Sequence, residues 1–286
     1  MRFGTIEKHC IYNQPQQHKK KLMDNIRPPL PQKPTKFLDQ LTFHMRSKNL
    51  AYRTEKTYIG WIKDFIIFHN KKHPEKMGTA EINAYLSHLS VTKNLSINSQ
   101  KTALNAIVYL YKKLLKREIG ELNFSYSQRP RNLPTVFSHE EAMTIIDQLE
   151  GVKKLAASLM YGSGLRVMES VRLRVKDIDF ANRCIIVREA KGMKSRRVLL
   201  PKNLIASLKD QQKFVIAQHK HDLALDYGDV YLPNALAIKY PNVSKEIGWQ
   251  YLFPATNFSK DPATNIKRRH HISEQNIQRA VKRAIT

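Results

Sequence analysis

A stretch without helical or strand periodicity divides this chain of 286 residues into two parts. It covers residues 121–136, is polar and basic at its centre, and contains Pro130 and Pro134, which exclude a helix. Apolar residues recur at regular spacing on both sides of it. We therefore expect two domains joined by a linker, and the chain is long enough to form them.

The part before the linker is predicted to be a four-helix domain over residues 35–120. Its apolar residues recur at helical spacing in four runs, Phe37 to Met45, Tyr58 to Ile66, Ile82 to Leu89 and Leu104 to Tyr111. Thr79 is expected to cap the third helix, and Ser96 or Asn98 the fourth. Residues 1–34 carry five of the thirteen prolines and a run of three lysines, which predicts a flexible basic arm.

The part after the linker, residues 137–286, is predicted to mix helices and strands, so that the whole chain is mainly α (α+β). Ser138 and Glu141 have the spacing of a capping box, and a short helix is expected to begin at Arg166. Short strands are predicted at residues 178–180, 185–187 and 198–200, the last two as a hairpin, before a helix over residues 204–219. Residues 227–271 interrupt the regular pattern, as an insertion would.

The charge of the chain points to a polyanionic partner. Lysine and arginine total 49 against 24 aspartate and glutamate residues, a net charge of +25. Hydrophobic residues make up 42% of the chain, which excludes a disordered basic tail. No apolar run could span a bilayer, no signal peptide opens the chain, and its two cysteines form no disulfide framework. These features predict a cytoplasmic protein.

Residues 162–166, Gly-Ser-Gly-Leu-Arg, are the most informative about function. Glycines permit a tight turn after which a helix begins with an outward arginine, and a guanidinium there can hold two phosphate oxygens. Glu169 follows one turn later on the same face. Taken alone, Arg166 and Glu169 would more often be an ordinary surface pair. The longer run over residues 159–173, followed by Lys176-Asp177-Ile178-Asp179, resembles the tyrosine recombinases.

This resemblance implies an N-terminal SAM-like core-binding domain and a C-terminal tyrosine recombinase catalytic domain. It implies that Arg166 is a catalytic arginine supported by Glu169, and that Lys191 protonates the leaving 5′ oxygen. Lys194 is near enough to confuse that assignment, and a basic turn alone is usually solvated or a phosphate clamp. The family cuts and rejoins DNA through a 3′-phosphotyrosine, without metal or cofactor, as a tetramer on DNA.

A third stretch, over residues 231–271, resembles the extra segment of integron integrases, which bind folded single strands with protruding unpaired bases. Flat side chains stack on such bases. The resemblance implies DNA contacts for Trp249, Pro262, Arg268, Arg269, His270 and His271, together with Lys194 and Arg196 of the hairpin. Without the resemblance, Trp249 would more often be a core residue and the two histidines part of a solvated basic patch.

The sequence departs from the family pattern after Lys191. No histidine there is followed three residues later by arginine, and the last tyrosine, Tyr251, lies inside the expected insertion. The chain ends part way through a helix that has Ile277, Val281 and Ile285 on one stripe, which predicts a C-terminal truncation. We therefore expect a protein that binds folded single-stranded and duplex recombination sites without cutting them. A catalytically inactive remnant and, less favoured, a basic RNA-binding protein are the alternatives.

Overall fold

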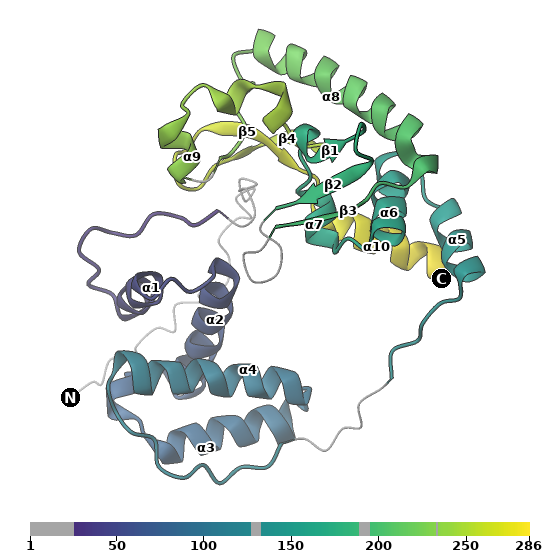
Figure 1. The fold of residues 1–286 in the computed structure, drawn as a ribbon. Coiled ribbons are helices and arrows are strands. Elements are labelled where there is room, and N and C mark those ends of the chain that lie inside the picture. Colours follow the sequence, from purple (N-terminus) through teal and green to yellow (C-terminus); the bar gives the residue numbers. More distant parts are fainter. Residues whose placement is uncertain (1–25, 127–132, 189–194, 233) are drawn as a thin grey trace, which may run out of the picture. The chain divides into compact units, whose positions relative to one another are not determined.

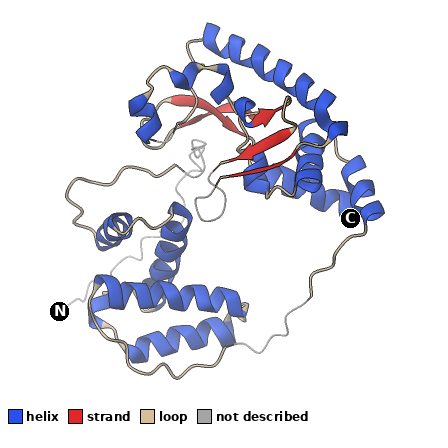
Figure 2. Ribbon diagram, viewed as in Figure 1, coloured by secondary structure: helices blue, strands red, loops and turns tan. Residues whose placement is uncertain are grey.

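The computed structural model describes residues 26–126, 133–188, 195–232 and 234–286. The described chain forms two compact units that meet in sequence between Thr135 and Val136, at the end of the predicted linker. Figure 1 shows the elements of each unit, and Figure 2 shows that the strands belong to the second. Within the described ranges, no helix is both long and apolar enough to cross a membrane.

The first unit is built from four helices, as the apolar spacing predicts. They are α1 (Phe37–Ser47), α2 (Tyr52–Phe68), α3 (Thr79–Ser87) and α4 (Ile97–Val108), and π-helical turns follow α3 (His88–Thr92) and α4 (Tyr109–Leu114). A short 3₁₀ turn, Pro74–Lys76, precedes α3. One core forms between the helices, and its fully buried side chains include Leu41, Phe65, Tyr85 and Ile107. Burial of these apolar faces is the main stabilising term of the unit.

One of the two predicted caps in this unit is correct. The Ser96 hydroxyl accepts a hydrogen bond from the backbone N–H of Ser99 and caps α4. Thr79, by contrast, is the first residue of α3, and Gly78 occupies the cap position. The Glu81 carboxylate accepts the N–H of Gly78 at 2.8 Å, while the Thr79 hydroxyl accepts the N–H of Gly120. The Thr79 side chain therefore holds the segment that follows α4 and does not cap α3.

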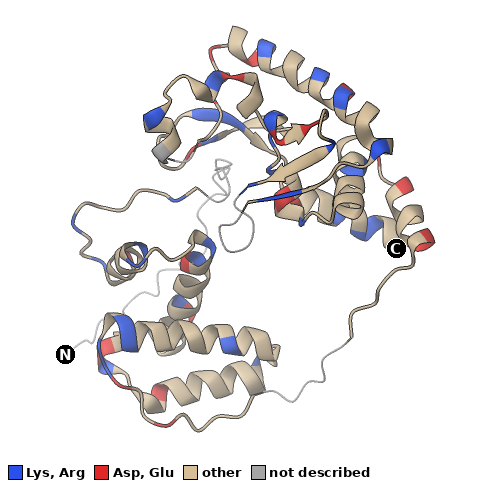
Figure 3. Ribbon diagram, viewed as in Figure 1, with Lys and Arg blue, Asp and Glu red and all other residues tan. Residues whose placement is uncertain are grey.

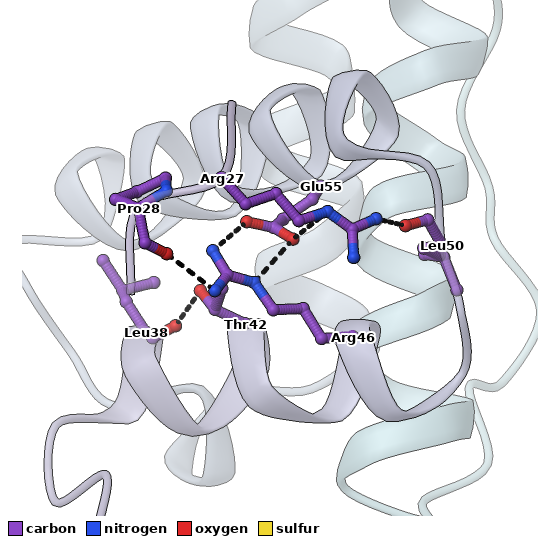
Figure 4. Close-up of polar contacts among 7 residues, drawn as sticks. All are labelled: Arg27, Pro28, Leu38, Thr42, Arg46, Leu50 and Glu55. Carbon is purple, nitrogen blue, oxygen red and sulfur yellow. Dashed lines mark hydrogen bonds and ion pairs between the residues drawn. The ribbon is translucent and has the colours of Figure 1, made fainter. Parts of the chain in front are cut away.

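A buried carboxylate attaches the start of the described chain to α1 and α2 (Figure 4). Glu55 of α2 accepts two hydrogen bonds from Arg46 of α1, at 3.0 and 2.9 Å, and only 3% of its side chain is exposed. Arg46 also donates to the carbonyl of Pro28, and Arg27 to that of Leu50. Residues 26–28 are thus held against the helices, so the expectation of a flexible arm is wrong for them. Residues 1–25 lie outside the described residues.

The second unit packs helices around a small antiparallel sheet in the order β1 (Ile178–Asp179), β2 (Cys184–Val187), β3 (Arg196–Leu199). The helices are α5 (His139–Asp147), α6 (Gly151–Ser163), α7 (Val167–Val171), α8 (Ile205–Ala224) and α10 (Glu274–Ile285), with 3₁₀ turns η4 (Val175–Asp177) and η5 (Lys202–Leu204). The predicted Ser138–Glu141 capping box opens α5. Ile277 of α10 is buried in the core with Leu159, Ile185 and Phe253.

The segment between α8 and α10 has a small fold of its own. It contains α9 (Asn234–Lys239), the 3₁₀ turns η6 (Val243–Lys245) and η7 (Ile247–Trp249), and an antiparallel hairpin of β4 (Pro254–Lys260) and β5 (Lys267–His271). Val230, Leu232 and Tyr251 form its buried centre. Arg174 joins the segment to the rest of the unit by donating hydrogen bonds to the carbonyls of Tyr231 and Trp249.

Replacing Arg46 with methionine is expected to lower the free energy of unfolding of the first unit by about 3 kcal/mol, because the buried carboxylate of Glu55 loses both hydrogen bonds from Arg46 and keeps the longer, 3.9 Å ion pair with Arg27. Urea unfolding followed through Trp61 of α2, in a Trp249→Phe background, measures this change. Lys72→Met is the matched control, since it breaks the more exposed pair with Glu81 and should cost less than about 1 kcal/mol. Equal losses in the two variants would contradict a structural role for the Glu55 cluster.

Candidate functional site

Arg166 lies at the junction of two helices in the second unit. Helix α6 ends at Ser163, and Gly164 follows with φ of +63°, a conformation that glycine adopts without strain. The chain then turns so that Arg166 is the N-cap residue of α7. About 60% of its side chain is exposed. The glycine turn therefore places a guanidinium at the surface, as the sequence predicts.

The carboxylate of Glu169 holds this arginine in place. It accepts hydrogen bonds from the backbone N–H and from Nη1 of Arg166, both at 2.9 Å. It also accepts two parallel bonds from Arg196 of β3, at 2.8 and 2.7 Å. Only 9% of the Glu169 side chain is exposed. One buried negative charge is thus shared by two guanidinium groups, and the cluster keeps a net charge of +1.

Hydrogen bonding keeps Glu169 ionised. The bonds from Arg196 are the largest cause, and with those from Arg166 they lower the pKa of Glu169 to about 2 although burial acts in the opposite direction. The same contact raises the pKa of Arg196. The cluster therefore has a fixed charge at neutral pH, which suits the binding of a phosphate oxygen.

Arginines flank the residues that connect β2 to β3. Arg196 begins β3 opposite Val187, the last residue of β2. Arg188 follows Val187 directly and donates from Nε to the buried carboxylate of Asp177, at 2.7 Å. Buried acidic groups thus fix the two ends of the segment that contains Lys191 and Lys194. These two predicted site residues themselves lie outside the described residues.

The two predicted base-stacking histidines are buried. His270 and His271 are 7% and 4% exposed, and both rings pack edge-on against Tyr251, at centroid distances of 5.3 and 5.2 Å. Neither ring offers an open face to a base, contrary to the expectation, because the end of β5 packs inward. The alternative of a solvated basic patch is wrong for the same reason.

Arg268 and Arg269, which are predicted to contact DNA, each form an ion pair with a buried aspartate. Arg268 is paired with buried Asp261, and Arg269 with buried Asp222. Arg269 further donates to the carbonyls of Ala255 and Thr256. Side-chain exposures of 14% and 12% show that both guanidinium groups serve the packing of the β4–β5 hairpin. Trp249 and Pro262, by contrast, are half-buried, with part of their surface exposed.

Three side chains near Trp249 were not predicted as site residues. Lys176 of η4 lies over the indole ring, and Arg174 contacts the rings of both Trp249 and Tyr251. Asp177 holds Arg188. The alternation of basic residues at 172, 174 and 176 was a sequence signal for this group.

In the described ranges, no group of three or more histidine, cysteine, aspartate and glutamate side chains could hold a metal ion.

The arrangement of charges around Arg166 indicates a class of site. Two arginines that share a buried carboxylate, next to the connection between β2 and β3, are an arrangement suited to a phosphate group of a polyanion. Lysine and arginine also recur along α8 and β5, whereas α5 begins with acidic residues (Figure 3).

Known proteins place the chain in a family. The model of the phage integrase N-terminal SAM-like domain matches residues 37–121, and that of the phage integrase family matches residues 135–286. Two proteins named integrase/recombinase, from Escherichia coli and Pseudomonas aeruginosa, are each 39% identical over 259 residues, which is 90% of this chain and 76% of theirs. A solved structure of the Tn1549 transposon integrase in complex with transposon right end DNA has a TM-score of 0.49 at 16% identity, covering 77% of this chain and 71% of that one.

The chain therefore belongs to the phage integrase family of tyrosine recombinases. Its first unit is the SAM-like helical domain and its second the mixed α/β domain of that family, which confirms the predicted fold class.

Replacing Glu169 with glutamine is expected to lower the free energy of unfolding at pH 7 by about 2–3 kcal/mol, because the folded pKa of about 2 lies below the ordinary value. A carboxyl with a lowered pKa stabilises the fold above its unfolded pKa, and the effect disappears as pH falls through the folded pKa. The difference between the two proteins should therefore shrink from about pH 4.5 to about pH 2.

Urea unfolding at several pH values measures this difference. The exposed pair Lys213 and Asp210 supplies the control, since Asp210→Asn should change stability by less than about 0.5 kcal/mol at any pH. A difference for Glu169→Gln that stays constant down to acidic pH would show that the carboxylate charge is not what the site depends on.

Proposed function

We propose that the chain binds the DNA of recombination sites and holds the phosphate at the point of strand exchange with Arg166. The observation that carries this proposal is the Glu169 carboxylate, which holds the exposed guanidinium of Arg166 and links it to Arg196 at the start of β3. A fixed cation that needs no rearrangement stabilises developing negative charge at little cost.

In the reaction of the family, a tyrosine displaces the 5′ oxygen and forms a 3′-phosphotyrosine, which conserves the bond energy for religation. The protein supplies orientation and charge for this step. Arg166 would stabilise the extra negative charge on the five-coordinate phosphorus. Lys191 would deliver the proton to the leaving 5′ oxygen, with Lys194 as a neighbouring phosphate contact.

We propose further that the substrate includes folded single strands, as for integron integrases. Trp249 supports this, because its partly exposed indole lies among the cations Arg174 and Lys176. An aromatic ring beside positive charge suits a base and its phosphate. This role does not extend to His270 and His271, whose rings are buried.

Tyr251 is not proposed as the nucleophile of the family's reaction. The Tyr251 side chain is 5% exposed, and burial raises the pKa of its hydroxyl. A hydroxyl that is covered and harder to ionise is a poor nucleophile. Binding and phosphate contact are thus the functions proposed for this polypeptide, and the covalent step is that of the family.

Affinity for a duplex recombination site should fall steeply with salt, because each neutralised phosphate releases counterions with a slope of roughly −0.9 in log–log units. Arg166→Ala should reduce that slope by about one contact and weaken binding. Fluorescence anisotropy at several salt concentrations measures both. Lys213→Ala on α8 is the matched control. A flat salt response, or equal losses of affinity in the two variants, would contradict the proposed phosphate site.

Competition by structured RNA tests the alternative of an RNA-binding protein.

Tyr251 should form no protein–DNA adduct with a nicked suicide substrate on a denaturing gel, because its side chain is only 5% exposed, whereas Tyr240, which also follows the hairpin, is 44% exposed. Anisotropy with the same substrate should still show binding, which controls for misfolded protein. An adduct that peptide mapping assigns to Tyr251 would contradict its exclusion as the nucleophile.

A further inference from the structure

Lys176 covers one face of the Trp249 indole. Its Nζ lies 2.6 Å from the centre of the ring, and both side chains are only half-exposed. The contact joins two 3₁₀ turns: η4, which follows α7, and η7, which precedes β4. One of the two faces on which an aromatic group could stack is therefore occupied by a cation.

The backbone on both sides of this contact is fixed. The N–H of Val175 donates to the carbonyl of Gln250 at 3.0 Å, and the carboxylate of Asp177 accepts the N–H of Arg174 at 2.9 Å. A Cβ on Gly248 would lie 3.5 Å from the Cβ of Lys176, so the two turns are in close contact. Lys176 can therefore leave the ring by rotation of its side chain, without a change in the fold.

The surroundings of Lys176 do not favour its positive charge. Arg188 and Arg174 repel it, while Asp177 and Glu246 attract it. The attraction from Asp177 is shared, because that carboxylate is hydrogen-bonded to Arg188. Burial, followed by repulsion from Arg188, lowers the pKa of Lys176 to about 8. Movement to a phosphate would relieve both effects.

This inference rests on the proposed binding of unpaired bases. We propose that Lys176 is a displaceable cover of Trp249: an unpaired base replaces it on the indole ring, and the released ammonium binds a phosphate of the same strand. Lys176 would thereby restrict the indole to ligands that offer a flat ring and an adjacent anion together. A nucleotide with an unstacked base has both.

The exchange predicts a pH dependence with a definite sign. Below about pH 8 the lysine carries its proton in the free and in the bound protein. Above that pH the free protein loses the proton, whereas a lysine bound to phosphate keeps it to about its ordinary pKa near 10.4. Binding then takes up a proton, so affinity falls as pH rises. The charged groups that face Lys176 are Arg174, Arg188, Asp177 and Glu246, and ordinary guanidinium and carboxyl groups keep their charge between about pH 7 and pH 9.

The experiment compares two labelled DNA hairpins, one with unpaired thymines and one in which the same thymines are paired. Wild-type protein should bind the first about tenfold more weakly at about pH 9 than at about pH 7, and the second with little change. Lys176→Arg should remove the difference, because a guanidinium stays charged over this range. An equal pH response for both hairpins, a flat response, or tighter binding at high pH would overturn the proposed exchange.

Failure of the exchange can be distinguished from failure of the proposed function. If the paired hairpin is bound but the unpaired one shows no extra pH dependence, DNA binding stands and the role of Lys176 falls. If neither hairpin is bound, both fall. Trp61→Phe leaves Trp249 as the single tryptophan, and its fluorescence without DNA should change with a midpoint near pH 8 that Lys176→Arg abolishes. A featureless titration would overturn the Lys176–Trp249 contact itself.

Discussion

The candidate site depends on one buried carboxylate that two arginines share. Glu169 accepts the backbone N–H of Arg166, one hydrogen bond from its side chain and two from Arg196. Because the carboxylate is almost fully covered, these bonds form in a low dielectric, where each is strong and the loss of any one is costly. They join α7 to β3 and so link the exposed guanidinium to the hairpin that contains Lys191.

Pairing of an arginine with a buried carboxylate also occurs away from this site, and it limits what the net charge says about DNA contacts. Buried acidic groups hold Arg46 in the first unit and Arg268 and Arg269 in the second, and the side chains of these three arginines are 12–19% exposed. These cations serve packing, and they are poorly placed to bind DNA. The net charge of +25 therefore indicates a polyanionic partner without identifying its contacts. Exposed cations such as Arg166, and those that can be released such as Lys176, are the better candidates.

The sequence predicted the helices of the first unit, the start of α5 and the Arg166 turn because their signals are local: apolar spacing, a Ser138–Glu141 box, and glycine before an arginine. It did not predict the β4–β5 hairpin, whose strands contain Pro254 and a run of basic residues that are poor strand formers. Buried partners distant in sequence hold that hairpin, above all Asp222 for Arg269. The inward packing of His270 has the same origin, since burial depends on tertiary contacts and no local pattern encodes it.

A double-mutant cycle on DNA affinity tests the central role of Glu169 most directly. Removing a negative charge should by itself strengthen binding to DNA, so the sign of the effect is informative. If Glu169 positions Arg166, Glu169→Gln should weaken binding in the wild-type background and should no longer do so once Arg166 is alanine. If Glu169→Gln strengthens binding equally in both backgrounds, the carboxylate acts only as a charge and does not organise the site.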